Sequence, residues 1–249
     1  MTKMHPVETN YAGDKIKILQ DKWSFSNQEV VDNFSTHIRR SVPLYDLGHD
    51  LLLQLSDHYT RDFQKKITCY DLGCSLGELT YKLAKRHQKC KNLTWVGIDQ
   101  EANMIDRARE RHNDLHNLEY MVSDITTFNF SKSSFIVCYY ILQFLSFNDR
   151  IKILEAIYQC LEPGGCVVIF EKVFADHAQV QELFSSLYIQ YKINNHYTAN
   201  EILKKKSSLH GVLNSLSSKE YSQILTEIGF KKQQTIMKYL CFEGMLAIK

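Results

Sequence analysis

The stretch Cys69-Tyr70-Asp71-Leu72-Gly73-Cys74-Ser75-Leu76-Gly77-Glu78 decides the fold that we expect, because it joins an apolar run to a glycine-rich turn. Residues 67–72 form a mainly apolar run of the length of a buried parallel strand. Ser75 and Glu78 have the S-x-x-E spacing of a helix capping box, so a helix is predicted to begin inside the turn. Gly73 and Gly77 lack Cβ atoms and let a ligand approach the backbone at the carboxyl end of this strand. The stretch therefore predicts a nucleotide site.

The spacing within the turn restricts the kind of nucleotide. A dinucleotide fingerprint requires G-x-G-x-x-G, but Ser75 occupies the position of the middle glycine. A P-loop requires G-x-x-x-x-G-K-[ST], and no such lysine follows Gly73 and Gly77. A ligand with adenosine and no phosphate remains. Asp99, which ends the next apolar run at residues 94–98, can accept both ribose hydroxyls of such a ligand.

At this point the chain resembles the class I S-adenosylmethionine-dependent methyltransferases. In that family the glycine loop lies against the methionine part of the cofactor, and the acid after the second strand holds the ribose. The acid after the third strand meets adenine, and Asp124 follows residues 118–122 at the expected place. Residues 135–140 and 161–165 resemble the fourth strand and the turn before the fifth. The resemblance implies an α/β fold, with a Rossmann-like seven-stranded sheet that has helices on both faces and binds S-adenosylmethionine.

Length and pattern divide the chain into few parts. The 249 residues, 44% of them apolar, suffice for one domain at residues 23–249, after a predicted mobile tail at residues 1–22. Ser26 and Glu29 form a second capping box, which predicts an amino-terminal helix that is either a lid or simply packed on the sheet. Residues 174–216, after the fifth strand, are expected to form a helical cap over the substrate.

The last third of the chain carries further helix signals. Thr198 and Glu201 predict a helix that runs from Glu201 to about residue 216. Ser217 and Glu220 form another capping box, which begins the last predicted helix, and Gly229 ends that helix. The final two strands of the sheet are expected within residues 232–249.

Charge and cysteine content exclude several classes of protein. The formal net charge is only +2, from 30 basic and 28 acidic residues, so we expect no partner among duplex nucleic acids or membranes. The amino terminus lacks an apolar leader segment, which predicts a cytoplasmic protein. Seven cysteines without a C-x-x-C pair indicate reduced thiols and no metal site.

A closer resemblance covers residues 23–249 and relates the chain to the carboxy-S-adenosylmethionine synthases, which serve wobble-uridine modification in bacterial tRNA. The shared stretches are Arg40-Ser41-Val42-Pro43-Leu44-Tyr45, residues 70–77, Leu142-Gln143-Phe144-Leu145, Glu171-Lys172 and residues 241–249. Members of that family transfer a carboxyl group from prephenate to the methyl carbon of S-adenosylmethionine through a sulfonium ylide. The resemblance also implies a homodimer, in which the residue that grips the carboxylate reaches into the neighbouring subunit's site.

The two resemblances and the turn pattern together give a set of expected cofactor contacts. These are Tyr45, Asp71, Gly73, Cys74, Ser75, Gly77, Asp99, Gln100, Met104, Asp124, Ile125 and Tyr139.

Two positions depart from the synthase pattern. Tyr139 stands where that family has an asparagine, and Lys206 stands where it has the arginine that grips the cofactor's extra carboxylate. A lysine is a point charge where arginine offers a planar fork, and loss of one fork hydrogen bond costs about 2 kcal/mol, or more than tenfold in affinity. We therefore expect ordinary methyl transfer to a small-molecule acceptor in a biosynthetic pathway. The alternatives are carboxy-S-adenosylmethionine synthesis and a cofactor-binding regulator without catalysis.

Methyl transfer requires groups that orient the acceptor or move a proton. His37, His196, Tyr139 and Tyr197 are the candidates, because histidine titrates near neutral pH and a tyrosine hydroxyl can hold an acceptor atom. Tyr191, Tyr197 and Lys206 are the expected substrate contacts, although the tyrosines are equally explained as core or interface aromatics. The stretch at residues 139–142 lacks the Asn/Asp-Pro-Pro-Tyr motif, which makes nucleic-acid adenine and protein glutamine unlikely acceptors.

Overall fold

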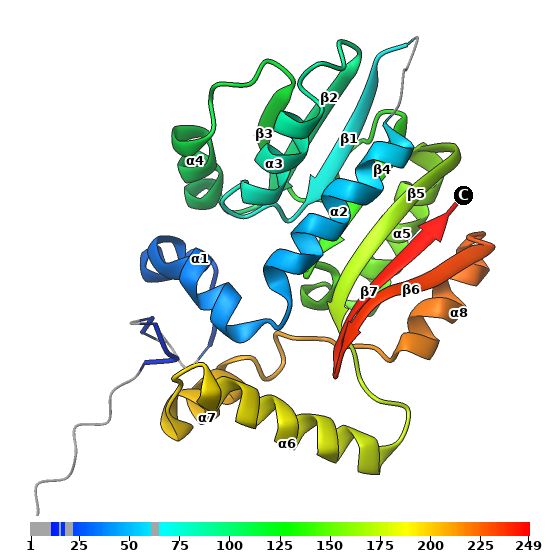
Figure 1. Cartoon of the computed structure of the whole chain (residues 1–249). Coiled ribbons are helices and arrows are strands. Elements are labelled where there is room, and N and C mark those ends of the chain that lie inside the picture. Colours follow the sequence, from blue (N-terminus) through cyan, green and yellow to red (C-terminus); the bar gives the residue numbers. More distant parts are fainter. Residues whose placement is uncertain (1–10, 15, 18–21, 61–64) are drawn as a thin grey trace, which may run out of the picture.

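A seven-stranded sheet in the order β3-β2-β1-β4-β5-β7-β6 forms the centre of the molecule (Figure 1). The computed structural model describes residues 11–14, 16–17, 22–60 and 65–249. Strands β1 to β5 are parallel, and β7 runs antiparallel to both of its neighbours. This confirms the expected class I methyltransferase sheet, including its two final strands. The strands are β1 (Ile67–Leu72), β2 (Leu93–Asp99), β3 (Leu118–Val122), β4 (Ser133–Tyr139), β5 (Leu161–Lys172), β6 (Lys232–Tyr239) and β7 (Phe242–Ile248).

Helices cover both faces of the sheet. Alternate residues of a strand point to opposite faces, so Leu72 packs with α5 and α8 on one face while Cys69 packs with α2 and α3 on the other. Burial on both faces explains why the central strands are almost continuously apolar. The helices are α1 (Gln28–Ser41), α2 (Tyr45–Tyr59), α3 (Glu78–Arg86), α4 (Ala102–Arg111), α5 (Phe147–Cys160), α6 (Ala178–Asn194), α7 (Ala199–Ser208) and α8 (Ser218–Ile228), with a short 3-10 helix, η1, at Leu142–Phe144.

The segments expected to act as lid and cap lie together. Helices α1, α6 and α7 gather beyond the carboxyl ends of the parallel strands, away from α5 and α8 (Figure 1). Helix α7 ends at Ser208, eight residues short of the expected end, because the chain turns there and its backbone bonds the amino-terminal segment through Trp23. Among the helices described, none has the length and apolar character that a lipid bilayer span requires.

Two of the four predicted capping boxes form. Thr198 and Glu201 exchange both hydrogen bonds of the box, as do Ser217 and Glu220 at the start of α8. Gly229 ends α8 with a φ of 125°, a conformation that favours glycine. Both predictions are confirmed, because each box joins residues that are close in the sequence.

The other two predicted boxes are wrong. Helix α3 begins after Gly77, whose φ is 72°, and Glu78 pairs with Arg39 and Lys82 instead of the turn. Helix α1 is capped by Asn27, which accepts a hydrogen bond from the Glu29 amide, in place of Ser26. In both cases a neighbouring residue provides a better helix start than the residue that the motif indicates.

The amino-terminal segment differs from the mobile tail that we expected at residues 1–22. Ala12 and Ile16 are buried beside Trp23 in a small apolar cluster. Asp14 bonds His37 from α1 and also contacts Arg40 and Tyr197, so this segment is tied to both the lid and the cap. Residues 1–10, 15 and 18–21 of the expected tail lie outside the described residues.

Candidate active site

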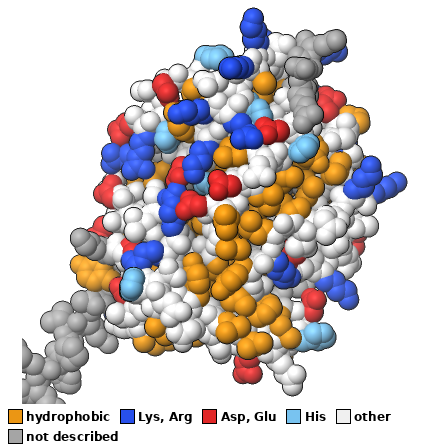
Figure 2. Space-filling model, in the orientation of Figure 1, with side chains coloured by type: hydrophobic (Ala, Val, Ile, Leu, Met, Phe, Trp, Pro, Cys, Tyr) orange, Lys and Arg blue, Asp and Glu red, His pale blue; other side chains and the backbone are white. Residues whose placement is uncertain are grey.

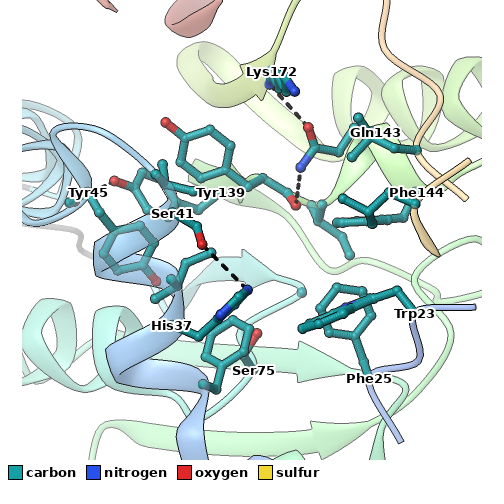
Figure 3. Close-up of a pocket in the computed structure, with 18 of the residues that line it drawn as sticks. Trp23, Phe25, His37, Ser41, Tyr45, Ser75, Tyr139, Gln143, Phe144 and Lys172 are labelled. Carbon is teal, nitrogen blue, oxygen red and sulfur yellow. Dashed lines mark hydrogen bonds between the residues drawn. The ribbon is translucent and has the colours of Figure 1, made fainter. Parts of the chain in front are cut away.

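A cavity of about 820 Å³ lies between the carboxyl ends of the parallel strands and the helices α1, α6 and α7. Its floor is the strand edge, where β1, β2 and β3 end in acidic turns. Its other walls come from the amino-terminal segment and the cap. In the view of Figure 3, Lys172 and Gln143 lie at one end, and Trp23, Phe25 and His37 lie at the other. Segments far apart in the sequence thus converge on one enclosed space.

The glycine turn is fixed by close packing. Gly73 has a φ of 72°, and a Cβ added there would lie 2.5 Å from Ile141. Asp99 at the end of β2 closes the turn, because its carboxylate accepts hydrogen bonds from the Ser75 amide at 2.9 Å and the Glu101 amide at 3.0 Å. The same carboxylate borders the cavity, and burial raises its pKa despite these amides. Asp99 is therefore held rigidly where a ribose can meet it.

Asp71 is a second buried acid in the cavity wall. It is 2% exposed and accepts a hydrogen bond of 2.6 Å from the Thr80 hydroxyl. Burial raises the pKa of Asp71 to about 7, the charge of Asp99 adds to the effect, and the Thr80 hydrogen bond opposes it. A cationic ligand beside Asp71 would favour the ionised carboxylate.

The expected cofactor contacts, apart from Gly77, lie along this cavity. Gly77 instead lies under the ring of Tyr120, where an added Cβ would be 2.5 Å from that ring, so it serves the turn and not the wall. The residues that line the cavity are Tyr45, Asp71, Gly73, Cys74, Ser75, Asp99, Gln100, Met104, Asp124, Ile125 and Tyr139. A nucleoside ligand fits this set, since the acids end adjacent strands and the loop backbone is open between them.

Comparison with known proteins places the chain in a family. Residues 69–165 match the family model of a methyltransferase domain. The chain is 37% identical to a carboxy-S-adenosyl-L-methionine synthase of Trichodesmium erythraeum, across 90% of this chain and 87% of that protein. The chain belongs to the carboxy-S-adenosyl-L-methionine synthase family. A synthase of Staphylococcus epidermidis is 29% identical, across 92% of this chain and 97% of its own length.

The solved structures agree with this assignment at the level of the fold. The plantazolicin methyltransferase BpumL, solved with S-adenosylhomocysteine and a substrate analogue, is 17% identical and superimposes with a TM-score of 0.63, covering 90% of this chain and 91% of its own. This member of the synthase family therefore has the class I methyltransferase fold, and it is a transferase that uses S-adenosylmethionine.

Two of the candidate catalytic residues line the cavity, but their polar atoms are already engaged. Tyr139 donates its hydroxyl to the backbone carbonyl of Tyr45 at 2.6 Å. His37 bonds Asp14 through Nδ1 at 2.9 Å, and Trp23 stacks on its ring. Burial lowers the pKa of His37 to about 4, although Asp14 opposes the shift, so the imidazole is neutral near pH 7. Tyr139 and His37 therefore hold the cavity wall in place.

The other candidates lie away from the cavity, which corrects the expectation for each. His196 is exposed in the turn after α6, where its φ of 67° directs the chain into α7. Tyr197 is buried behind His37 and bonds Asp14 and Ser41. Tyr191 packs its ring against Tyr239 at the outer side of α6. Lys206, by contrast, borders the cavity of its own chain.

Sequence reasoning missed three further lysines of the cavity wall. Lys205 is one of three consecutive lysines in the sequence, and Lys172 belongs to the Glu171-Lys172 stretch that is shared with the synthase family. Lys192 is the only residue of α6 classed as buried among those described, and it also lines the cavity. A lysine among apolar and aromatic residues in the last turn of α6 is the signal available for it.

One group of side chains has the composition of a metal site, but its carboxylates form ion pairs with basic residues. Asp46, His49 and Glu78 bring ligand atoms within 4.8 Å of one another. Arg39 pairs with both carboxylates, and the Lys82 ammonium lies 2.9 Å from Glu78. The carboxylates therefore neutralise two cations of the chain.

Proposed function

We propose that this enzyme carboxylates the methyl group of S-adenosylmethionine, with prephenate as the carboxyl donor. The relatives that match nearly the whole chain are named for carboxy-S-adenosyl-L-methionine synthesis, which favours this alternative over methylation of a small acceptor. One observation carries the proposal. Four lysine side chains line the cap side of a single cavity, namely those of Lys172, Lys192, Lys205 and Lys206, although burial lowers the pKa of Lys205 well below its usual range.

The charges in the cavity are separated. Asp71, Asp99 and Asp124 end the strands on the floor, whereas the described lining residues from Lys172 onward include no carboxylate. The sulfonium and amino groups of S-adenosylmethionine are cationic and match the acidic floor, close to Asp71. A second reactant placed against the cap meets only positive charge, which favours an anion such as a carboxylic acid. A neutral methyl acceptor would leave these lysines without a partner.

The reaction itself needs a dry, closed space. The methyl carbon loses one proton and forms a carbon–carbon bond to the carboxyl carbon, which prephenate releases as carbon dioxide. Prephenate also loses its ring hydroxyl, which leaves as water with the proton from the methyl group, and so becomes phenylpyruvate. Trp23, Phe25 and Phe144 form an aromatic cluster at the edge of the cavity, with Phe25 and Phe144 edge to face at 5.0 Å. These rings exclude water, which would otherwise reprotonate an ylide carbon.

Lysine at position 206 was the reason to expect methyl transfer. A lone lysine is a weaker partner for a carboxylate than an arginine fork. However, Lys172 and Lys206 lie close to each other. Burial lowers the pKa of Lys172, and the positive charge of Lys206 lowers it further. Charge supplied by several ammonium groups therefore offsets the loss of one planar fork.

We further propose that two copies of the chain associate through the outer face of α6. Figure 2 shows a continuous band of hydrophobic side chains on the face that α2, α6 and β6 share. Exposed apolar residues of this kind usually mark an interface when they are contiguous. Exposed apolar residues of these elements include Leu47 on α2, Leu183 and Leu187 on α6 and Tyr239 on β6, with Leu44 just before α2; they are 56%, 54%, 44%, 39% and 37% exposed.

Mass spectrometry of the small molecules released from the enzyme tests the reaction. The enzyme is incubated with S-adenosylmethionine and prephenate and then denatured. Carboxylated cofactor is the expected product, and its formation must depend on prephenate. Release of unchanged S-adenosylmethionine alone, with prephenate unconsumed, contradicts the proposal and returns the search to a methyl acceptor.

A further inference from the structure

Two of the cavity lysines converge on one aromatic ring. The ammonium groups of Lys172, at the end of β5, and Lys192, on α6, each lie 4.8 Å from the centre of the Tyr188 ring. The Tyr188 hydroxyl donates to the backbone carbonyl of Ser41 at 2.8 Å, so the ring is fixed to the end of α1. The pair of cations is thus held at a defined place by three separate elements.

Neither lysine has an acidic partner. Among the described residues, the lysine ion pairs involve Lys82, Lys152 and Lys238 but neither Lys172 nor Lys192. Cation–π contact attracts an ammonium group without neutralising its charge. Lys172 is further positioned by its backbone amide, which donates to the Gln143 side chain at 3.1 Å (Figure 3). Both charges therefore remain available to a ligand.

The positive charges of Lys172 and Lys192 repel each other. Lys192 is 8% exposed, and burial together with the charge of Lys172 lowers the pKa of Lys192 to about 8. Burial and the charge of Lys206 lower the pKa of Lys172 in the same way. An anion bound between the lysines would reduce this repulsion, and the reduction would strengthen binding of the anion.

The surroundings of the pair are aromatic. The rings of Tyr188 and Phe242 lie 5.1 Å apart, and Tyr140 packs beside Phe242 at 6.1 Å, all three on the cavity wall. A flat hydrocarbon ring fits against such a surface. The ligand that matches both features is a carboxylic acid with a cyclic body.

We propose that Lys172 and Lys192, beside Tyr188, form the subsite that binds a carboxylate of the carboxyl donor. Lys206, which lies close to Lys172, is assigned instead to the carboxylate of the product cofactor. The inference rests on the proposed function, since it takes the donor to be an anionic acid. It assigns to the two lysines a role in donor binding and none in binding S-adenosylmethionine.

Calorimetry on the enzyme loaded with S-adenosylhomocysteine tests the subsite without turnover. The ligands are prephenate, which has two carboxylates, and phenylpyruvate, which has one. Lys172→Met and Lys192→Met are each expected to weaken prephenate binding about tenfold, since a charge-assisted hydrogen bond contributes about 1.5–3 kcal/mol. Binding of S-adenosylhomocysteine should stay within twofold. Lys152→Met, which alters a lysine whose side chain is 68% exposed on α5, is the matched control.

Several outcomes overturn the subsite. The subsite is overturned if both methionine variants fold and bind prephenate with wild-type affinity. It is also overturned if the Lys152→Met control loses as much prephenate affinity as they do. Should the methionine variants unfold, Lys192→Arg keeps the charge and should bind prephenate within about threefold of the wild type. In addition, wild-type binding of prephenate should weaken with added salt more steeply than binding of phenylpyruvate. Equal salt dependence contradicts the assignment.

The subsite and the proposed function can fail separately. Carboxylated cofactor formed by lysine variants that bind prephenate normally would retain the function and remove the subsite. Lysine-dependent binding of prephenate without any carboxylated cofactor in the wild type would retain the subsite and remove the function.

Discussion

The hydroxyl of Tyr139 donates a 2.6 Å hydrogen bond to the backbone carbonyl of Tyr45, and so ties the end of β4 to the first turn of α2. The space for this hydroxyl is provided by Gly48, because a Cβ at that position would lie 2.2 Å from the Tyr139 oxygen. The tyrosine that departs from the synthase pattern is thus accommodated by a glycine one turn into the neighbouring helix.

This pairing predicts a double-mutant cycle. Gly48→Ala should lower the free energy of unfolding by about 1–3 kcal/mol, because the added methyl group overpacks the site. Tyr139→Phe alone should cost about 1 kcal/mol for the lost hydrogen bond. In the double variant, the cost of the alanine should largely disappear, since the hydroxyl that it meets is gone. Urea unfolding measures all four proteins, and additive costs would argue against direct contact.

Asp71 predicts a pH dependence of stability. Its pKa is raised from 3.8 to about 7 in the fold, so the folded state favours the protonated carboxyl. The stabilisation is complete below about pH 4 and is lost as the pH rises towards 7 and above. From pH 5 to pH 8 the free energy of unfolding should fall less in Asp71→Asn than in the wild type. The difference between the two proteins should be a few kcal/mol at most. Parallel pH profiles would contradict this expectation.

S-adenosylmethionine should act on the same group. Its cationic sulfonium favours the ionised form of Asp71, so its binding should strengthen from pH 6 to pH 8. S-adenosylhomocysteine has no sulfonium and should show a smaller change. Calorimetry of both ligands provides the comparison, and Asp71→Asn is expected to remove the difference between them.

Asp14 is predicted to hold the amino-terminal segment over the cavity. It bonds His37 at 2.9 Å and contacts Arg40 and Tyr197 while its side chain is only 3% exposed. Asp14→Asn should cost about 1–3 kcal/mol and speed hydrogen exchange at residues 11–14 and 16–17. Asp106→Asn, whose side chain is 66% exposed in its pair with Arg109, should change neither quantity. Unchanged exchange in Asp14→Asn would mean that apolar packing alone secures the segment.

Lys206→Arg is predicted to strengthen retention of a carboxylated cofactor. A guanidinium fork makes two parallel hydrogen bonds to a carboxylate where an ammonium group makes fewer. About tenfold tighter binding is expected for the arginine variant, and about tenfold weaker binding for Lys206→Met. Affinity for S-adenosylmethionine, which lacks the added carboxylate, is the internal control. Equal effects on both cofactors would remove Lys206 from this role.

The apolar face of α6 predicts an association that a single charge should weaken. Sedimentation velocity of the wild type at micromolar concentration is expected to show a dimer. Leu183→Glu places a carboxylate within the face and should shift the equilibrium to monomers. Met121→Glu, at a position 39% exposed on the opposite edge strand β3, serves as the control. A monomeric wild type would also exclude any reach of Lys206 into a neighbouring subunit.

Much of the fold was predictable because its signals are local. The central strands are buried on both faces and read as apolar runs, and Asp99 and Asp124 follow directly from where those runs end. The capping boxes at Thr198 and Ser217 succeeded for the same reason. At the turn after β1 the rule failed because Glu78 pairs with Arg39, which lies 39 residues earlier in the chain.

The cap side of the cavity could not be predicted in the same way. Whether Lys172 and Lys192 face solvent or the cavity depends on how α6 lies across the ends of the strands. A local sequence pattern does not predict that arrangement. The burial of Ala12 and Ile16 depends likewise on Trp23 and on helix α1. Tyr197 is predicted at the site because a tyrosine hydroxyl can hold an acceptor atom, but this hydroxyl bonds Asp14 behind the cavity wall.

Trp23 belongs to both walls of the cavity. Its ring stacks on His37 of α1 at 5.2 Å, contacts the Lys205 ammonium of α7, and its backbone amide donates to Ser208 at 3.1 Å. Displacement of Trp23 would therefore remove the aromatic neighbour of Lys205 and a backbone hydrogen bond of α7 together. A substitution at Trp23 thus disturbs both the helix that carries His37 and the helix that carries the cavity lysines Lys205 and Lys206.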